Sequence, residues 1–436
     1  MALVFLLAPY QLRAQAVPPA APIDYGDEQA LATLVWQHAP EVVAARREAM
    51  VAGSEITRAH LYPNPRLDLG WNTIPIGRTT PPDLQDPIGN VPNYTAGLSE
   101  LFELAKRGPR QAAAAAAFEA SRSQAIAVFA DRFFDLLRAV GHIATAQVRV
   151  ALSDEQVQEG ARLLELERAR AQRGEIAGVL VDRSETEQAR LVDARDAART
   201  ELEAARAECS ALIAAPCPPF SSGDAARRFL QDGARAPLPT AWSSDIEERR
   251  PDLSALAQAL RAADEEVTLA KRQAIPDVTL RFGYTYDTFV TAGNQRQSLG
   301  LGMEMPIPVL DHGQADLEAA SAAVISAQRA RASLKASGQY TLESAARERE
   351  LIDTRRTQLQ AVLGTANQVR HSMEGAAQQG GMSQIEVLLA RRRYQELLLE
   401  GAELEGAAYA TSLKLRQTAA LFPRPNGDRD REDRQG

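Results

Sequence analysis

The sequence predicts a mainly α-helical protein with a β-barrel portion, in which long coiled-coil hairpins and four β-strands form two copies of one unit. The first observation is a repeat, because residues 40–71 align without a gap on residues 251–282, at a constant offset of 211. The second is a change of hydrophobic period, from helical to strictly alternating, at a proline in each copy. The third is length: each alternating segment has ~10–12 residues, as in a tilted strand that crosses a bilayer.

Each copy begins with a helix that carries a coiled-coil seam. The seam residues are small or aliphatic and step by three and four in both copies, as expected for closely packed helices. They are Val42, Ala45, Ala49, Ala52, Ile56 and Ala59 in the first copy, and Leu253, Leu256, Leu260, Ala263, Val267 and Ala270 in the second. Pro65 and Pro276 then occupy equivalent positions, and alternation follows each of them. A helix that becomes a strand twice is the architecture to be explained.

The order of segments follows from these patterns. Residues 1–16 are predicted to be a signal peptide, because an apolar run precedes the small-x-small tripeptide Ala14-Gln15-Ala16; the alternative is a disordered, mildly apolar tail. The remaining ranges are an N-terminal segment (17–39), a first repeat (40–215), an irregular connector (216–250), a second repeat (251–421) and a disordered tail (422–436). The expected strands span about 66–76, 93–104, 277–290 and 298–309, and the hairpin tips lie near 174 and 380.

Four strands cannot close a barrel, since small barrels need about eight. Lipid tolerates strands only in closed barrels, because an open edge leaves backbone groups unpaired. Either the strands are not transmembrane, or several chains pool them. The sequence contains no run of 18 apolar residues, so we expect no transmembrane helix.

Composition argues against several functions. A net charge of −8 and an aromatic content of 5% do not fit a nucleic-acid binder, which normally shows a basic stripe. The five histidines are scattered, so no metal site is expected. The sequence shows no nucleophile motif, phosphate loop or dinucleotide fingerprint, and we expect no cofactor and no enzymatic activity.

Three segments, taken in order, carry a family resemblance: "HLYPNPRLDLG" after the first seam helix, "MPIPVLDHGQADLEAA" after the fourth strand, and "GGMSQIEVLLARRRYQELL" after the second tip. With them, nearly all of residues 30–421 resembles the TolC-like outer-membrane factors of tripartite efflux pumps. The resemblance implies a homotrimer with a twelve-stranded barrel in the bacterial outer membrane and a helical barrel that extends into the periplasm. The same resemblance implies an equatorial region formed by the connector (216–250) and the chain ends. It also implies a periplasmic adaptor and an inner-membrane transporter of the resistance-nodulation-division or a similar type. "MPIPVLDHGQ" is most similar to members that serve heavy-metal efflux.

The resemblance assigns adaptor docking to the two hairpin tips. The residues concerned are Arg173, Gly174 and Glu175 at the first tip, and Gly380, Gly381, Met382 and Ser383 at the second. An ordinary turn between helices, with glycine as the C-cap, accounts for the same residues and is compatible with docking.

Glu386 is a candidate for the periplasmic entrance. Some family members carry "D-V-L-D-A" here, with two acidic residues that ring the closed entrance, whereas this chain reads Glu386-Val387-Leu388-Leu389-Ala390. Glu386 matches the first acid and Leu389 replaces the second. Three carboxylates around a trimer axis favour cations over anions. The alternative is a solvated helix glutamate.

Cys209 and Cys217 lie eight residues apart. In an exported protein they could form a disulfide that pins a helix end to the proline-rich segment after it. Two unpaired small residues are the other possibility.

A periplasmic adaptor or coiled-coil scaffold is the alternative function. It explains the helices, but an adaptor would show one hairpin flanked by β-rich modules. Neither alternative explains four alternating segments in two copies.

Overall fold

The computed structural model describes residues 23–78, 82, 84–235, 238–290, 295–379 and 381–424. The predicted signal peptide, most of the predicted tail and the tip residue Gly380 lie outside the described residues. The chain divides into two compact units, with boundaries inside two long helices, after Val128 and after Gln339. The sheet unit comprises Ala44–Val128 and Ser243–Gln339, and the rest of the described chain is the helical unit.

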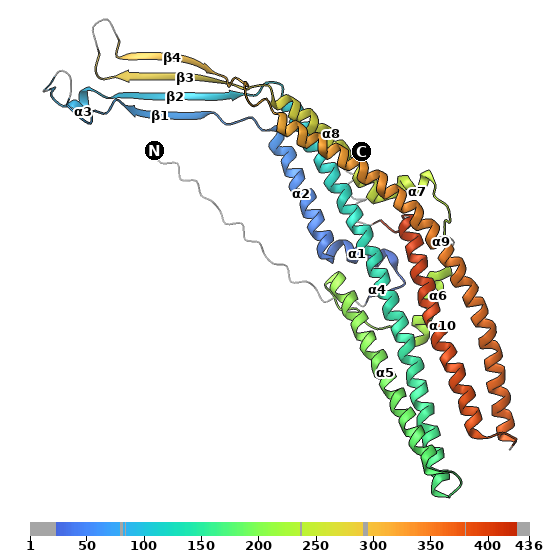
Figure 1. Ribbon diagram of the computed structural model, residues 1–436. Helices are drawn as coiled ribbons and strands as arrows, with labels where there is room; N and C mark the ends of the chain where they lie inside the picture. Colours follow the sequence, from blue (N-terminus) through green and yellow to red (C-terminus); the bar gives the residue numbers. More distant parts are fainter. Residues whose placement is uncertain are drawn as a thin grey trace. The chain divides into compact units, whose positions relative to one another are not determined.

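The sheet unit joins the strands of both copies in one antiparallel sheet of order β1-β2-β3-β4 (Figure 1). Its strands are β1 (Arg66–Asn72), β2 (Asn93–Phe102), β3 (Val278–Asp287) and β4 (Gln297–Glu304). The helices that lie wholly or mainly in this unit are α2 (Pro40–His60), α3 (Pro87–Asn90), α7 (Ser244–Arg249) and α8 (Pro251–Gln273). The two central strands come from different copies of the repeat, β2 from the first and β3 from the second. They pair with each other, so the two copies form one continuous sheet.

The strands end earlier than the alternating pattern extends. β1 ends at Asn72 and β4 at Glu304, although alternation continues toward residues 76 and 309. Pro75 follows β1, and Pro306 follows β4. A proline cannot donate to a strand ladder, so pairing stops before it even where the hydrophobic pattern runs on.

The end of α2 is held by arginines from the next long helix, α4 (Arg107–Gln172). Arg110 Nη2 lies 3.3 Å from the carbonyl oxygens of Ala59 and Leu61, and Arg107 Nη2 donates to the His60 carbonyl at 3.1 Å. The last carbonyls of a helix lack partners and carry negative partial charge, which cationic donors satisfy. The helix therefore stops at a fixed place before β1.

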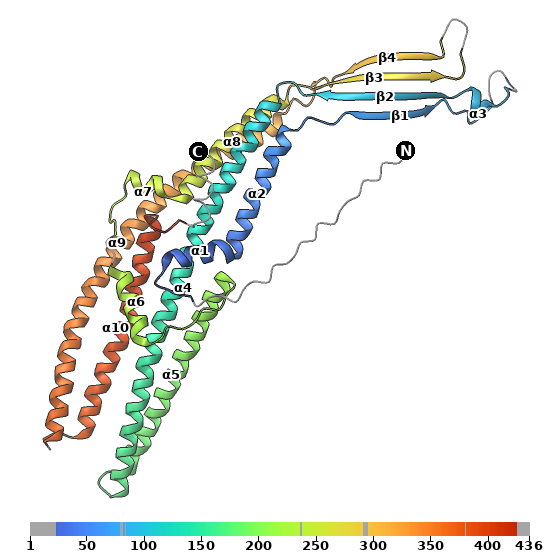
Figure 2. The same cartoon turned by 180° about the vertical axis from the view of Figure 1, so that it is seen from behind.

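The helical unit contains α1 (Glu28–His38), most of α4, and α5 (Gly178–Ile213), α6 (Gly223–Arg235) and α10 (Gln384–Thr418). It also contains the second part of α9 (Gln314–Gln378). The pairs α4–α5 and α9–α10 are the two helical hairpins, and α6 runs beside α10 in both views (Figure 2). None of the described helices combines the length and apolarity that a membrane crossing requires.

The core of the helical unit brings α1 and the segment after α10 together on α4. Phe129, Phe133 and Phe134 are fully buried there. Trp36 from α1 meets Phe129 edge to face, with ring centroids 5.6 Å apart, and Phe422 packs on Phe129 at 6.0 Å. Aromatic rings contribute large buried areas, so this cluster holds α1 and Phe422 against α4.

The connector differs from the expected irregular segment, because residues 216–250 contain α6 and α7. Ser222 accepts from the Ala225 amide at 3.1 Å and begins α6. Ala226, Leu230 and Ala234 follow at intervals of four and are buried. Prolines on both sides make this short helical period hard to detect in the sequence. In the structure, α6 packs as an amphipathic helix.

Candidate functional site: the hairpin tips, the sheet face and the connector

The first tip is a short turn closed by backbone hydrogen bonds. Gly174 takes a left-handed φ of +76°, which glycine adopts without strain. The Gly174 amide donates to the Ala171 carbonyl at 2.9 Å, and the Glu175 amide to the Arg170 carbonyl at 3.0 Å. Glu175 also pairs with Arg170 at 3.2 Å and Arg173 at 2.8 Å. The tip thus presents charged side chains on a defined backbone.

The second tip is organised around the start of α10. The Gly381 amide donates to the Ala376 carbonyl at 2.9 Å, which closes the end of α9. Ser383 caps α10: its Oγ accepts from the Glu386 amide at 3.3 Å, while the Ser383 amide donates to Glu386 Oε2 at 3.0 Å. This reciprocal pair is a capping box, which satisfies two otherwise unpaired amides. Met382 is half-buried in the turn.

The capping box gives Glu386 a structural task that the sequence analysis missed. The spacing Ser383-x-x-Glu386 before an apolar run is the sequence pattern for such a box. The Glu386 side chain is exposed, so its charge also remains available to solvent. Leu389, one turn later, is 60% exposed and lines a groove with Leu180 of α5. The structure thus brings Leu389, and not Glu386, against the first hairpin.

The sheet has one apolar and one polar face. Leu67, Leu98, Phe282 and Leu301 stand side by side across β1 to β4, and the next row is Leu69, Ala96, Tyr284 and Leu299. The other face carries small and polar residues in two rows. One row is Asp68, Gly97, Gly283 and Gly300, and the other is Gly70, Thr95, Thr285 and Ser298. The apolar side chains are strongly exposed, with Leu301 at 86%. An apolar outer face opposite a polar one is typical of strands in a membrane barrel.

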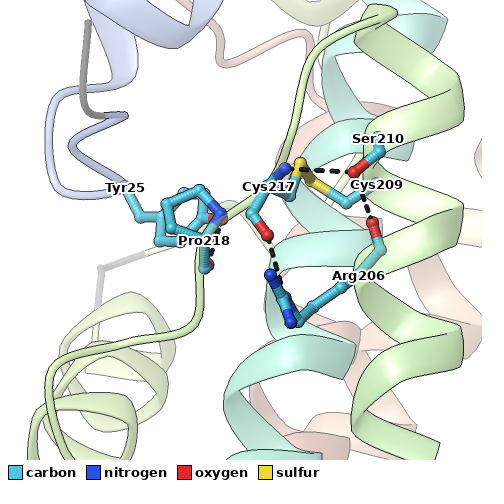
Figure 3. Close-up of a disulfide and its surroundings, with 6 residues drawn as sticks. All are labelled: Tyr25, Arg206, Cys209, Ser210, Cys217 and Pro218. Atoms are coloured by element: carbon cyan, nitrogen blue, oxygen red, sulfur yellow. Dashed lines mark hydrogen bonds between the residues drawn. A yellow bond between two sulfur atoms is a disulfide. The ribbon is translucent and has the colours of Figure 1, made fainter.

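The end of α5 is joined to the connector by a disulfide (Figure 3). Cys209 and Cys217 are bonded with their α-carbons 6.0 Å apart, and both side chains are buried. Two polar contacts flank the bond: the Cys217 amide donates to Ser210 Oγ at 3.0 Å, and Arg206 Nε donates to the Cys217 carbonyl at 3.1 Å.

Further contacts hold the residues that follow the disulfide. The Tyr25 hydroxyl donates to the Pro218 carbonyl at 2.7 Å (Figure 3). Burial raises the pKa of Tyr25 to about 12, against an opposing effect of the Arg206 charge, so the hydroxyl keeps its proton. Gln147 of α4 exchanges two hydrogen bonds of 2.8 Å with the backbone of Phe220. The connector is therefore tied to α4, α5 and the N-terminal segment.

Within the described ranges, no group of three or more His, Cys, Asp or Glu side chains is arranged to hold a metal ion.

Residues 242–420 match the family model described as outer membrane efflux protein. This stretch is an outer membrane efflux protein domain. The match agrees with the family resemblance of the sequence motifs and with the predicted location in the bacterial outer membrane.

The fold of the whole chain is that of known outer-membrane channels. The outer-membrane channel OprN superposes with a TM-score of 0.70 at 16% identity, over 91% of this chain and 90% of that one. The CmeC outer membrane channel of Campylobacter jejuni gives 0.70 at 13% identity, over 99% and 97%. These structures confirm the predicted fold class, mainly helical with a small sheet.

A curated relative adds similarity in sequence. Protein CyaE of Bordetella pertussis is 26% identical over 323 residues, which is 70% of this chain. The match spans 66% of that relative, just under two thirds of its length.

Proposed function

We propose that this chain is the outer-membrane duct of a tripartite efflux pump and works as a homotrimer. The observation that carries the proposal is the sheet, whose edge strands β1 and β4 have no partner within the described part of the chain. Open edges are not tolerated in lipid, and four strands are too few to close. Pairing β1 of one copy with β4 of the next removes both edges. Three copies, the number that the resemblance to TolC-like factors implies, give twelve strands.

The helical hairpins supply the periplasmic end of the proposed duct. Their tips present exposed charged and small residues on turns that carry backbone hydrogen bonds. Such rigid ends suit docking of a periplasmic adaptor, because little conformational freedom is lost on binding. The duct is passive and not an enzyme, so we assign the choice of substrate, heavy-metal cations included, to an inner-membrane transporter.

The entrance is the second feature of this proposal. Glu386 keeps an exposed carboxylate at the start of α10, and Leu389 lies one turn away. In a trimer, three Glu386 carboxylates around one axis form a single acidic ring that favours cations. Leu389 replaces the second acidic ring with an apolar one.

Edge pairing is tested by cysteine crosslinking in membranes. The variant pairs place one cysteine on β1 and one on β4, on the same face, and scan the register with L67C or L69C against L299C or L301C. At least one pair is expected to yield covalent dimers and trimers on oxidation. The control pair L98C with L301C replaces the β1 cysteine by one on the inner strand β2, which already has neighbours on both sides, and is expected to give none. A monomer that gives no crosslink in any register would refute the trimeric duct.

A further inference from the structure

Two exposed charges of opposite sign lie at the two open edges of the sheet. Arg66 is the first residue of β1, and Asp311 lies between β4 and α9. Because β1 begins where β4 ends, both residues lie at the same end of the sheet (Figure 1). Within the described ranges neither side chain forms an ion pair. The Asp311 carboxylate accepts from the nearby Gly313 amide at 3.0 Å.

The internal repeat gives Arg66 an equivalent in the second copy. Pro65 aligns with Pro276, each at the junction between a seam helix and a strand. The next residue in each copy is Arg66 before or at the start of β1, and Asp277 just before β3. The two positions are therefore equivalent, although their charges are opposite.

The same comparison gives Asp311 an equivalent in the first copy. Gly108 and Gly313 lie at the start of the two long helices α4 and α9, which have 66 and 65 residues. Two residues before these glycines stand Lys106 in the first copy and Asp311 in the second. These positions too are equivalent, and again their charges are opposite.

Lys106 and Asp277 are in contact within the chain. The Lys106 Nζ lies 2.9 Å from Asp277 Oδ2, and the two side chains are only 17% and 20% exposed. This ion pair lies beside the β2–β3 pair, where the first copy of the repeat meets the second. It links the segment that follows one strand to the residue that precedes the next.

We infer that Arg66 of one copy of the chain forms an ion pair with Asp311 of the next copy. The inference rests on the proposed duct, in which β4 of one chain lies beside β1 of its neighbour. That contact is then equivalent to the contact of β2 with β3 inside one chain, and its ion pair is the equivalent of Lys106–Asp277. Both signs are exchanged, so the attraction is kept. A head-to-tail contact of this kind closes a ring of copies.

Apolar side chains next to the inferred pair fit the same arrangement. Phe102 of β2 stands opposite Val278 of β3. Their equivalents are Ile307, after β4, and Leu67 of β1, which are 77% and 69% exposed in the single chain. The equivalence places Leu67 of one copy beside Ile307 of the next, so the apolar row of the sheet continues from chain to chain.

The ion pair is tested by exchanging its charges in the full-length protein. R66D and D311R each bring like charges together, and R66D/D311R restores an opposite pair. The measurement is the rate at which trimers dissociate in detergent at low salt, followed by native mass spectrometry. Each single variant is expected to dissociate about tenfold faster than wild type, from three pairs of modest individual strength. The double variant is expected within twofold of wild type, and 1 M salt should reduce the differences.

A matched control and a crosslink complete the test. R78D changes another exposed arginine, past the far end of β1, and is expected to dissociate within twofold of wild type. The cysteine pair L67C with I307C extends the register scan and is expected to yield disulfide-linked trimers on oxidation, whereas I307C alone should yield none.

The outcomes separate this inference from the duct itself. If wild type is a trimer but R66D and D311R behave like R78D, or if the double variant dissociates as fast as the single variants, the inference is overturned and the duct stands. Absence of the L67C–I307C crosslink in a trimer has the same consequence. A wild-type protein that forms no trimer overturns both.

Discussion

Removing the disulfide tests how the connector is held. The double variant C209A/C217A opens a ring in which the cysteines are eight residues apart. Alanine is preferred to serine because both side chains are buried, and a hydroxyl there would need a partner. In the chain-entropy description, a loop of this length restricts the open state by about 2.5 kcal/mol at 25 °C. Loss of that restriction corresponds to a roughly 70-fold larger population of the open connector.

Hydrogen–deuterium exchange measures this population at two amides. The segment around the disulfide contains Pro216, Pro218 and Pro219, which carry no amide hydrogen. The reporters are therefore the amide of Cys217, bound to Ser210 Oγ at 3.0 Å, and the amide of Phe220, bound to Gln147 Oε1 at 2.8 Å.

The two amides are expected to respond unequally. Position 217 loses its covalent anchor and keeps the hydrogen bond from Arg206 to its carbonyl, so its exchange should accelerate toward the full 70-fold. Phe220 is still held by both hydrogen bonds to Gln147 and should accelerate less. A change below about threefold at position 217 would refute the view that the disulfide anchors the connector. Equal acceleration at both amides would show that the connector opens as one segment.

Two further predictions concern the second hairpin and the core. E386Q removes the charge and retains the capping box, because either Glu or Gln can form it. Single-channel recordings of this variant in planar bilayers should show a reduced preference for cations. The control variant E400Q, further along α10, should leave the ion preference unchanged. G141A places a Cβ against the ring of Tyr409. We expect this overpacking to lower the free energy of unfolding by about 1–3 kcal/mol. Its control is G364A in α9, where a Cβ meets nothing within 4 Å, and this change should leave stability unchanged or raise it by up to about 1 kcal/mol. Unaltered ion selectivity in E386Q, or equal melting of the two glycine variants, would contradict these expectations.

The repeat and the period switch are what made the fold predictable. A side-chain period of two identifies a strand with two different faces, and the register places Leu67, Leu98, Phe282 and Leu301 in one row as that pattern requires. Strand ends were less predictable, since the hydrophobic pattern continues past the prolines that stop the ladder. The hydrophobic pattern of one chain predicts that its sheet has two unpaired edges. It does not predict how several chains associate, because that depends on contacts between copies.

The sequence predicted where the hairpin tips lie along the chain, but not which side chains contact one another in the fold. Glycine at a helix end marks a turn, which explains why the tip at Gly174 could be found from sequence. The pairing of Arg392 on α10 with Glu187 on α5, at 2.9 Å, could not be found, because it depends on two helices that meet only in the fold.

The two copies preserve the junction from helix to strand by different chemistry. In the first copy, Arg107 and Arg110 cover the carbonyls at the end of α2. In the second copy, Gly313, with φ at +80°, lies close to the end of α8, where a Cβ would sit 3.7 Å from the Ala270 carbonyl oxygen. Charge also contributes to the second junction, because Asp277, just before β3, pairs with Lys106 Nζ at 2.9 Å and accepts from the Leu104 amide at 3.1 Å. The feature common to both copies is a helix that stops shortly before a strand. In the proposed barrel this junction recurs at each strand pair, and closure requires a consistent stagger of all the strands.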